Sequence, residues 1–218
     1  MIKIAPSILS ADFGDLRNQV KAVEAAGADL LHIDIMDGHF VPNLSMGPGV
    51  VKSIRQSSKL FFDCHLMLDN PLDYIEAFAS AGADLITVHA ECVADLKAAA
   101  DKIHSLGIKA AAAINPATEA DKVIDAAEYL DMILVMSVVP GFGGQSFMPE
   151  VLGKVRQIKA AGSVPVEIDG GINAETAPLA AKAGVDIFVA GSSVFGAPPF
   201  SEAISQIRKA AENALSCG

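Results

Sequence analysis

Short apolar segments alternate with amphipathic ones along the whole chain. Eight of the apolar segments are mostly rich in Ile, Val and Leu and are bounded by Gly, Pro or Asp, which predicts β-strands. Their hydrophobicity is continuous rather than alternating, as in parallel strands that are buried on both faces. The weakest strand propensity is that of KAAAAI at 109–114. The predicted strands are 3–9, 30–35, 60–67, 84–89, 109–114, 132–138, 164–169 and 186–191.

The amphipathic segments between these strands predict helices. Asp12 is placed to cap a helix that runs through Ala26, and Pro71 suits the first turn of a helix that ends near Ala81. Thr118 is placed to cap the fifth helix, with an acidic residue three positions later. Each helix is expected to end shortly before the next strand begins.

One phrase recurs at the helix-to-strand junctions, as AAGADLLHI, SAGADLITV and KAGVDIFVA. Its glycine ends a helix in a left-handed conformation, and the next strand follows at once. Repeated αβ units predict parallel strand pairing and the α/β class. We expect a single domain over residues 1–218, folded as an eight-stranded (β/α)8 TIM barrel with outer helices. The alternative is an open doubly wound sheet, but no G-x-G-x-x-G turn follows the first strand.

Composition narrows the function classes. The chain is 51% hydrophobic and carries a net charge of −10, which indicates a large core and an acidic surface. Such a surface disfavours nucleic acid and anionic membranes. The N-terminus is neither a signal peptide nor an anchor, and no apolar run reaches the roughly 18 residues of a membrane span. Cys64, Cys92 and Cys217 are odd in number and widely spaced, which favours a reduced, cytoplasmic setting.

Ionisable residues lie late in several predicted strands, at the end where barrels carry their chemistry. His32 and Asp34 point to one face of the second strand, while His65 and Asp169 lie late in the third and seventh. Burying such groups is unfavourable unless they are paired or bind a metal ion. The mixed nitrogen and oxygen set suits one divalent ion, Zn²⁺, Fe²⁺, Mn²⁺ or Co²⁺. Spacing alone leaves both interpretations open, a metal site and paired core groups.

Other residues near these positions are predicted to support the site, to pack in the core or to lie on the surface. Asp63 and Glu167 lie deeper in their strands and are expected to support the site or to pack, whereas His39 and His104 are expected on the surface. Cys64 faces away from His65 and is expected to be a buried small hydrophobe. Three methionines late in their strands either pack the core or exclude water from the site: Met36, Met67 and Met136.

Glycine-rich loops follow the sixth, seventh and eighth strands, at 140–146, 169–171 and 191–193. Backbone N–H groups that glycine exposes can hold an anion without lysine, and barrels commonly bind phosphate in these last loops. Flexible turns are the alternative. A Schiff-base lysine is excluded, because Lys3 and Lys109 stand at the beginning of their strands.

The chain resembles the ribulose-phosphate 3-epimerase family from Ser7 to about Phe195. The segments HIDIMDGHFVPN and PGFGGQ are the most specific part of the resemblance. The full set is SILSADF (7–13), HIDIMDGHFVPN (32–43), DCHLM (63–67), INPAT (114–118), VMSVVPGFGGQSF (135–147), EIDGGI (167–172) and AGSSVF (190–195).

The resemblance implies a TIM barrel that interconverts D-ribulose 5-phosphate and D-xylulose 5-phosphate in the pentose phosphate pathway. It implies one divalent metal ion on His32, Asp34, His65 and Asp169, with Asp34 as proton acceptor and Asp169 as proton donor. Val139 departs from the family, whose members often carry Asn or Glu there, so substrate affinity is expected to differ. The resemblance further implies substrate contacts from Ser7, His65, Gly141, Phe142, Gly143, Gly144, Asp169, Gly170, Gly171, Gly191 and Ser192.

Three other functions fit parts of the pattern. One is an epimerase for a six-carbon ketose phosphate such as D-allulose 6-phosphate. A second is a decarboxylase of the orotidine-monophosphate type, but its Asp-x-Lys-x-x-Asp motif is absent from Asp34-Ile35-Met36-Asp37. A third is a non-catalytic sugar-phosphate binding barrel, which retention of all four metal-matching residues disfavours. For partners we expect a small sugar phosphate, neither nucleic acid nor membrane, and a homo-oligomer.

Overall fold

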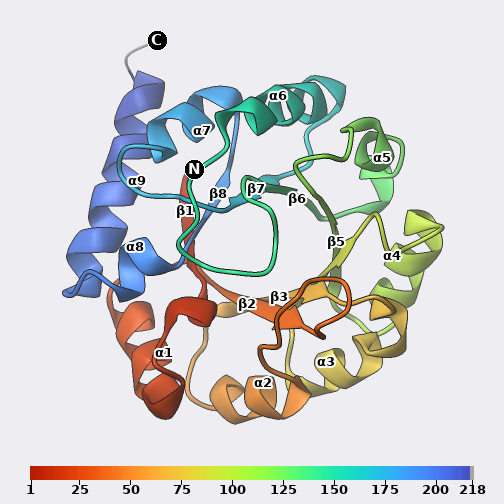
Figure 1. The fold of residues 1–218 in the computed structure, drawn as a ribbon, viewed down its shortest axis with the longest axis horizontal. Helices are drawn as coiled ribbons and strands as arrows, with labels where there is room; N and C mark the ends of the chain where they lie inside the picture. The colour runs from red at the N-terminus through yellow and green to blue at the C-terminus, as the bar shows by residue number, and fades with distance from the viewer. Residues whose placement is uncertain (217–218) are drawn as a thin grey trace.

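A computed structural model describes residues 1–216, and these form a ring of eight parallel strands with helices outside it (Figure 1). The α/β barrel prediction is confirmed, and every predicted strand is present, including the alanine-rich β5. The strands are β1 (Lys3–Pro6), β2 (Leu30–Met36), β3 (Phe61–Met67), β4 (Leu85–His89), β5 (Lys109–Ile114), β6 (Met132–Met136), β7 (Val166–Asp169) and β8 (Ile187–Ala190).

The first strand is shorter than predicted for a local reason. β1 stops at Pro6 because Ser7 caps a 3-10 turn over Ile8–Ser10, its hydroxyl accepting from the backbone N–H of Leu9. The chain thus turns at Ser7, at the carboxyl end of the strand.

Helices separate the strands, and three predicted helix starts need correction. Asp12 caps a 3-10 turn over Phe13–Asp15, and the α-helix begins only at Leu16. The Thr118 cap was wrong, because the Thr118 hydroxyl donates to Glu91 and Ala120 precedes the short fifth helix without a side-chain cap. Pro71 opens a 3-10 turn that leads into α3. The helices are α1 (Leu16–Ala25), α2 (Pro48–Arg55), α3 (Ile75–Ala81), α4 (Leu96–His104), α5 (Asp121–Ile124), α6 (Leu152–Ala161), α7 (Ala177–Ala183), α8 (Ser192–Phe195) and α9 (Phe200–Ser216).

The recurring junction phrase behaves as predicted. Its glycines, Gly27, Gly82 and Gly184, have φ of 90°, 105° and 107°, which is the left-handed region that lets a helix end sharply. The following strand begins within a few residues in each case. These glycines therefore set the lengths of the αβ units.

An aspartate before each even-numbered strand ties it to the strand before. Its N–H donates to the carbonyl of one residue there, and its carboxylate accepts from the N–H of the same residue, at 2.8–3.0 Å. Each carboxylate also contacts a lysine or arginine. This pair of hydrogen bonds sets the pairing register of the two strands at the amino end of the barrel. The pairs are Asp29 with Ile4, Asp84 with Phe62, Asp131 with Ala110, and Asp186 with Val166.

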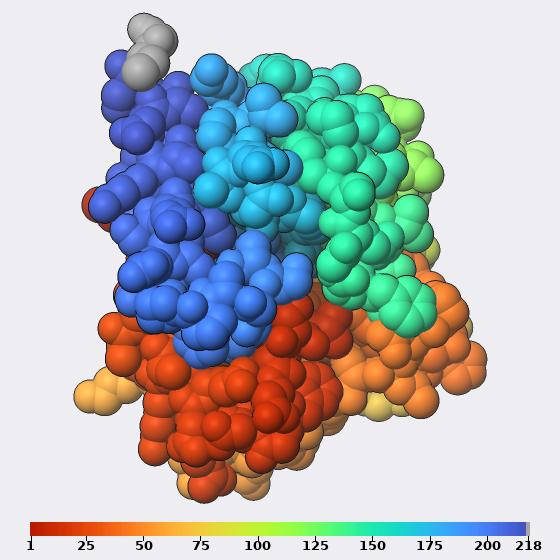
Figure 2. Space-filling view, turned by 60° about the vertical axis from the view of Figure 1, so that its left-hand side comes forward, coloured from red at the N-terminus to blue at the C-terminus, as the bar shows by residue number. Residues whose placement is uncertain are grey.

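The ring closes where the first two strands meet. β1 and β2 share a parallel bridge between Ser7 and His32, besides the Asp29 bonds to Ile4. From outside, Arg208 of α9 donates to the carbonyls of Ile2 and Gly27 and to the Asp29 carboxylate, at 3.0, 2.7 and 2.8 Å. Figure 2 shows the C-terminal part of the chain packed directly on the N-terminal part.

The barrel interior is layered. At the amino end an apolar cluster, which includes Leu30, Leu85, Met132 and Ile187, fills the ring. Because side chains alternate along a strand, the next inward positions toward the carboxyl end carry the ionisable groups. Cys64 instead points outward into the core beneath the helices, as predicted, and burial raises the pKa of its thiol. Cys217 lies outside the described residues, among which no helix is long and apolar enough to span a membrane.

Removing the aspartate at the closure tests its role in stability. We expect Asp29→Ala to lower the free energy of unfolding by about 2 kcal/mol, because the Ile4 N–H and Arg208 both lose a charged partner. The melting temperature should fall by about 4–8 °C in thermal denaturation. Asp125→Ala, at an exposed aspartate, should change stability by less than about 0.5 kcal/mol. Equal effects of the two substitutions would contradict the assignment.

Candidate active site

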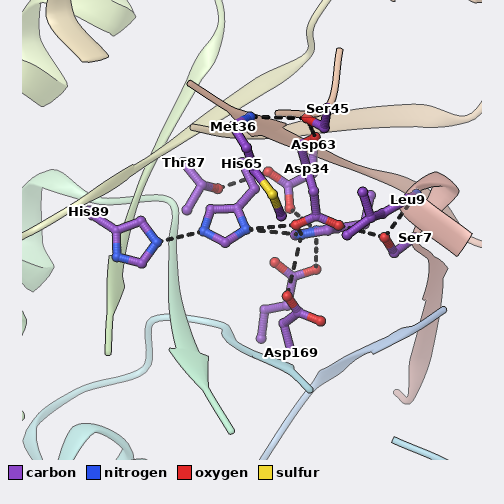
Figure 3. Close-up of polar contacts among 12 residues, drawn as sticks. Ser7, Leu9, Asp34, Met36, Ser45, Asp63, His65, Thr87, His89 and Asp169 are labelled. Atoms are coloured by element: carbon purple, nitrogen blue, oxygen red, sulfur yellow. Dashed lines mark hydrogen bonds and ion pairs between the residues drawn. The ribbon is translucent and has the colours of Figure 1, made fainter. Parts of the chain in front are cut away.

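The four predicted metal-binding residues meet at the carboxyl end of the barrel. Their ligand atoms all lie within 4.8 Å of one another. His32 Nε2 is 3.3 Å from Asp34 Oδ1 and 3.3 Å from His65 Nδ1. His65 Nδ1 is 3.1 Å from the same Asp34 oxygen, and Asp169 Oδ2 is 4.0 Å from His32 Nε2. In Figure 3 the carboxyl group of Asp169 lies across from that of Asp34.

Strand register explains this convergence. β2 and β3 are neighbours, and their pairing places His32 opposite Asp63 and Asp34 opposite His65. Asp169 ends β7, from which its side chain reaches back across the barrel interior. Residues far apart in sequence therefore share one site because the sheet closes on itself.

The second nitrogen of each histidine is held by another side chain. His32 Nδ1 lies 2.8 Å from Asp63, whose other oxygen accepts from the Thr87 hydroxyl. His65 Nε2 lies 2.8 Å from His89 Nε2. Asp63 thus has the supporting position predicted for it, and these contacts leave His32 Nε2 and His65 Nδ1 to face the carboxylates.

The site fits a divalent cation. A tetrahedral zinc site with bonds near 2.0–2.1 Å has ligand atoms about 3.3 Å apart, close to the separations among His32, Asp34 and His65. Two imidazole nitrogens and two carboxylates form the mixed donor set that Zn²⁺, Fe²⁺, Mn²⁺ and Co²⁺ accept. The group could therefore hold a metal ion.

Electrostatics favour positive charge at this point. Burial opposes a charged His32, but the carboxylates of Asp34 and Asp63 outweigh burial and raise the pKa of His32 well above its ordinary value. Burial likewise opposes ionisation of Asp34, but His32 and His65 hold the pKa of that carboxyl below its usual range. The field that favours a proton here also favours a metal cation.

The two facing aspartates differ in acidity. Asp34 accepts from Ser7 Oγ at 2.5 Å through one oxygen and faces both histidines through the other. Asp169 lacks such donors, so burial and the nearby Asp34 charge raise its pKa to about 7. The pair offers one carboxylate and one carboxylic acid near neutral pH, which is the pattern of an acid and base acting together.

Glu167 is the unpaired group beneath the site. Neither of its carboxyl oxygens has a hydrogen-bond partner, and the nearest His32 nitrogen is 3.7 Å away. Burial and the neighbouring Asp63 charge raise the pKa of Glu167 well above its ordinary value. A neutral carboxylic acid is the form that such a site accommodates.

A cavity of about 730 Å³ opens above the ionisable groups. Asp34 and Asp169 line it, whereas His32 and His65 are fully buried behind them and are not part of its lining. Three buried methionines cover part of the wall. The other predicted residues in the lining are Ser7, Met36, Met67, Met136, Gly141, Phe142, Gly143, Gly144, Gly170, Gly171, Gly191 and Ser192.

The glycine loops surround one side of this cavity. Figure 1 shows the segment after β6 reaching over the barrel opening. Gly170 and Gly171 have φ of 125° and 64°, and a Cβ there would meet Val138 at 2.6 Å and Phe147 at 2.5 Å, so larger residues do not fit. No lysine, arginine or histidine is among the lining residues of the described chain. An anion here would meet backbone N–H groups and hydroxyls.

Several residues at the site were not anticipated. They include His89, the last residue of β4, and Glu91, whose carboxylate lies 3.1 Å from His89. Their spacing of two residues at a strand end was the available signal. Ser10 also lines the cavity, whereas Val139 is exposed and lies outside the lining. His39 and His104 are on the surface, as predicted.

Comparisons with known proteins point to one family. Residues 3–195 match the model of the ribulose-phosphate 3 epimerase family. Ribulose-phosphate 3-epimerase of Bacillus subtilis is 47% identical over 214 residues, covering 95% of this chain and 99% of that protein. The cytoplasmic isoform of Oryza sativa is 45% identical over 215 residues, covering 96% and 94%.

A solved structure, 3-keto-L-gulonate-6-phosphate decarboxylase from Vibrio cholerae, superposes with a TM-score of 0.73 at 19% identity. The match covers 97% of this chain and 98% of that one. At this identity the likeness supports the barrel fold alone. The family match and the identities of 45–47% are stronger evidence, and they show that the chain belongs to the ribulose-phosphate 3-epimerase family.

Proposed function

We propose that this enzyme interconverts D-ribulose 5-phosphate and D-xylulose 5-phosphate by moving a proton at C3. The observation that carries the proposal is the facing pair of Asp34 and Asp169, which line one cavity with opposite protonation preferences. Inverting a carbon next to a carbonyl requires a base on one face and an acid on the other. The family membership supports the same reaction.

In this proposal Asp34 removes the C3 proton of ribulose 5-phosphate. The C–H electron pair moves toward the C2 carbonyl, which gives an enediolate with negative charge on oxygen. Asp169, as a carboxylic acid, delivers its proton to the opposite face of C3 and yields xylulose 5-phosphate. The reverse reaction exchanges the two roles. Positioned acid–base groups contribute roughly 10²–10⁴-fold to rates.

His32, Asp34, His65 and Asp169 would hold one divalent ion, Zn²⁺, Fe²⁺, Mn²⁺ or Co²⁺. When bound, such an ion supplies Lewis-acid stabilisation of negative charge on the substrate oxygens. Ser7 is proposed to contact the sugar, in keeping with its place in the cavity lining and its bond to Asp34. A contact from His65, which the resemblance implies, would require the sugar to reach past this lining, because the His65 side chain is fully buried. Met36, Met67 and Met136 are proposed to exclude water from the intermediate with apolar sulfur side chains.

The phosphate is proposed to bind among the loops after β6, β7 and β8. The lining there supplies backbone N–H groups of glycine together with the hydroxyl of Ser192. The residues proposed for these contacts are Gly141, Phe142, Gly143, Gly144, Gly170, Gly171, Gly191 and Ser192. Uncharged donors of this kind suit an anion when no lysine or arginine lines the cavity.

We also propose a domain organisation, an assembly state and a location for the chain. The chain is proposed to act as one domain, since Arg208 of α9 returns to donate to the carbonyl of Ile2, directly before β1. It is proposed to form a homo-oligomer, which the exposed side chains of Leu44, Val139 and Phe142 support. A cytoplasmic location is supported by the named isoform of the Oryza sativa relative.

Metal removal should abolish activity. The two buried histidines and two carboxylates would lose their common cation, so prolonged chelation is expected to reduce epimerase turnover to background. Adding Mn²⁺, Co²⁺, Zn²⁺ or Fe²⁺ should restore turnover, whereas Ca²⁺, which prefers all-oxygen sites, should not. A sample shown by metal analysis to be metal-free and yet fully active would overturn this part of the proposal.

Asp169→Asn separates the two aspartates. The amide is nearly isosteric but donates no acid proton, so epimerisation should fall by about 10²–10⁴-fold or more. Asp34 should still exchange the C3 proton of ribulose 5-phosphate with D₂O, while xylulose 5-phosphate stays unlabelled in proton NMR. Asp69→Asn makes the same change at an exposed residue outside the cavity lining and should behave as wild type.

Metal content of the Asp169→Asn variant is measured first, so that loss of the ion is recognised. With metal bound, equal deuterium uptake by both epimers would contradict the two-base assignment. Near-normal epimerisation would contradict it as well.

A charge at the phosphate loop should weaken substrate binding. Ser192→Asp places a carboxylate in the lining, and like charges a few ångströms apart repel enough to raise KM by at least about tenfold. Ser192→Asn introduces a side chain of the same size as aspartate but without its charge, and should change KM by less than about threefold. Steady-state kinetics of both variants decide the matter, and equal KM values for them would place the phosphate elsewhere.

A further inference from the structure

A chain of side-chain contacts leads from the site to the outer face of the barrel mouth. His65 Nε2 lies 2.8 Å from His89 Nε2, and His89 Nδ1 lies 3.1 Å from Glu91 Oε2. Figure 3 shows the two rings side by side, with His89 on the side away from Asp34. Both rings are fully buried, so water does not compete for these nitrogens.

Two ring nitrogens at this separation share one proton. One nitrogen must donate and the other must accept, and a neutral imidazole has one of each. The direction of the His65–His89 bond therefore depends on both outer nitrogens. Nδ1 of His65 faces Asp34, which is already paired with Ser7 and His32, and Nδ1 of His89 faces a group of its own. That group is a carboxylate oxygen, which only accepts when ionised.

Glu91 thus orders the protons along the chain. Its carboxylate takes the Nδ1–H of His89, so Nε2 of His89 carries the lone pair and accepts from Nε2–H of His65. The lone pair of His65 is then left on Nδ1, the nitrogen that faces Asp34 at 3.1 Å. We propose that Glu91, acting through His89, is a positioning residue that keeps Nδ1 of His65 free to bind the metal ion.

The surroundings of Glu91 hold it in this orientation. Its other oxygen, Oε1, accepts from the Asn115 backbone N–H at 2.8 Å and from the Thr118 hydroxyl. Lys154 of α6 in turn donates to the carbonyls of Asn115, Pro116 and Thr118. The loop after β5 is therefore held from two sides, and Oε2 of Glu91 is directed at His89.

This arrangement makes Glu91→Gln a sharp probe. The Asn115 and Thr118 donors require the amide oxygen at the Oε1 position, so the amide NH₂ must face Nδ1 of His89. His89 then carries its proton on Nε2 and donates to His65, whose own proton moves to Nδ1. A protonated Nδ1 cannot bind a metal ion.

The experiment rests on the proposed metal site and uses Co²⁺ as the probe. Titration followed by visible absorption should show a Co²⁺ affinity for Glu91→Gln about 10–100-fold below wild type, the range typical of losing a partner of a metal-binding histidine. Glu119→Gln removes a charge from the neighbouring loop, after β5, at an exposed residue with no contact to His89, and should bind Co²⁺ like wild type. Unchanged affinity in a folded Glu91→Gln variant would overturn the proposal.

The tautomer of His89 gives a second readout that needs no metal. Long-range ¹H–¹⁵N NMR on the five histidines should show His89 protonated at Nδ1 in wild type and at Nε2 in Glu91→Gln. A wild-type His89 protonated at Nε2 would overturn the proposal whether or not the variant folds. If wild type binds no Co²⁺, the proposed function loses its metal site, and the wild-type tautomer still decides whether Glu91 orders the protons.

Discussion

Burial of ionisable side chains is the constraint on which the rest of this structure depends. Three histidines and four carboxyl groups lie almost without water at one end of an apolar barrel. An isolated charge there would be strongly unfavourable, so each group must find a counter-charge, a hydrogen bond or a proton. Asp63 is the hydrogen-bond partner of Nδ1 of His32, and His89 is the partner of Nε2 of His65. The other ring nitrogens of His32 and His65 then face the carboxylate oxygens of the site, and a bound cation would stabilise this group of lone pairs.

The same constraint differentiates chemically identical residues. Asp34 lies between two histidines and the Ser7 hydroxyl and stays ionised, while Asp169 faces the cavity with the Asp34 charge nearby and holds a proton more readily. An acid and a base thus arise from one residue type through position alone. The acidic net charge of the chain is compatible with the proposed phosphate site, because that site relies on backbone N–H groups and no lysine or arginine lines the cavity.

Stability and chemistry are placed at opposite ends of the barrel. The aspartates before the even strands tie neighbouring strands at the amino end, below the apolar layer. The ionisable residues occupy the inward positions above that layer, and their mutual distances follow from the register so established. Substitutions at the aspartate ties should therefore affect unfolding more than catalysis, and substitutions at the cavity the reverse.

The sequence by itself determined the element order, because continuous apolar runs and left-handed glycines are local signals that adjacent residues encode. It also determined which residues point inward late in their strands, since alternation assigns a face to each side chain. Only the tertiary structure decided which inward residues meet. Asp169 reaches His32 from β7, and His89 lies against His65. Thr118 donates its hydroxyl hydrogen bond to Glu91 instead of capping the fifth helix. These contacts depend on ring closure and strand register, which bring together residues whose separation along the chain carries no record of their distance in space.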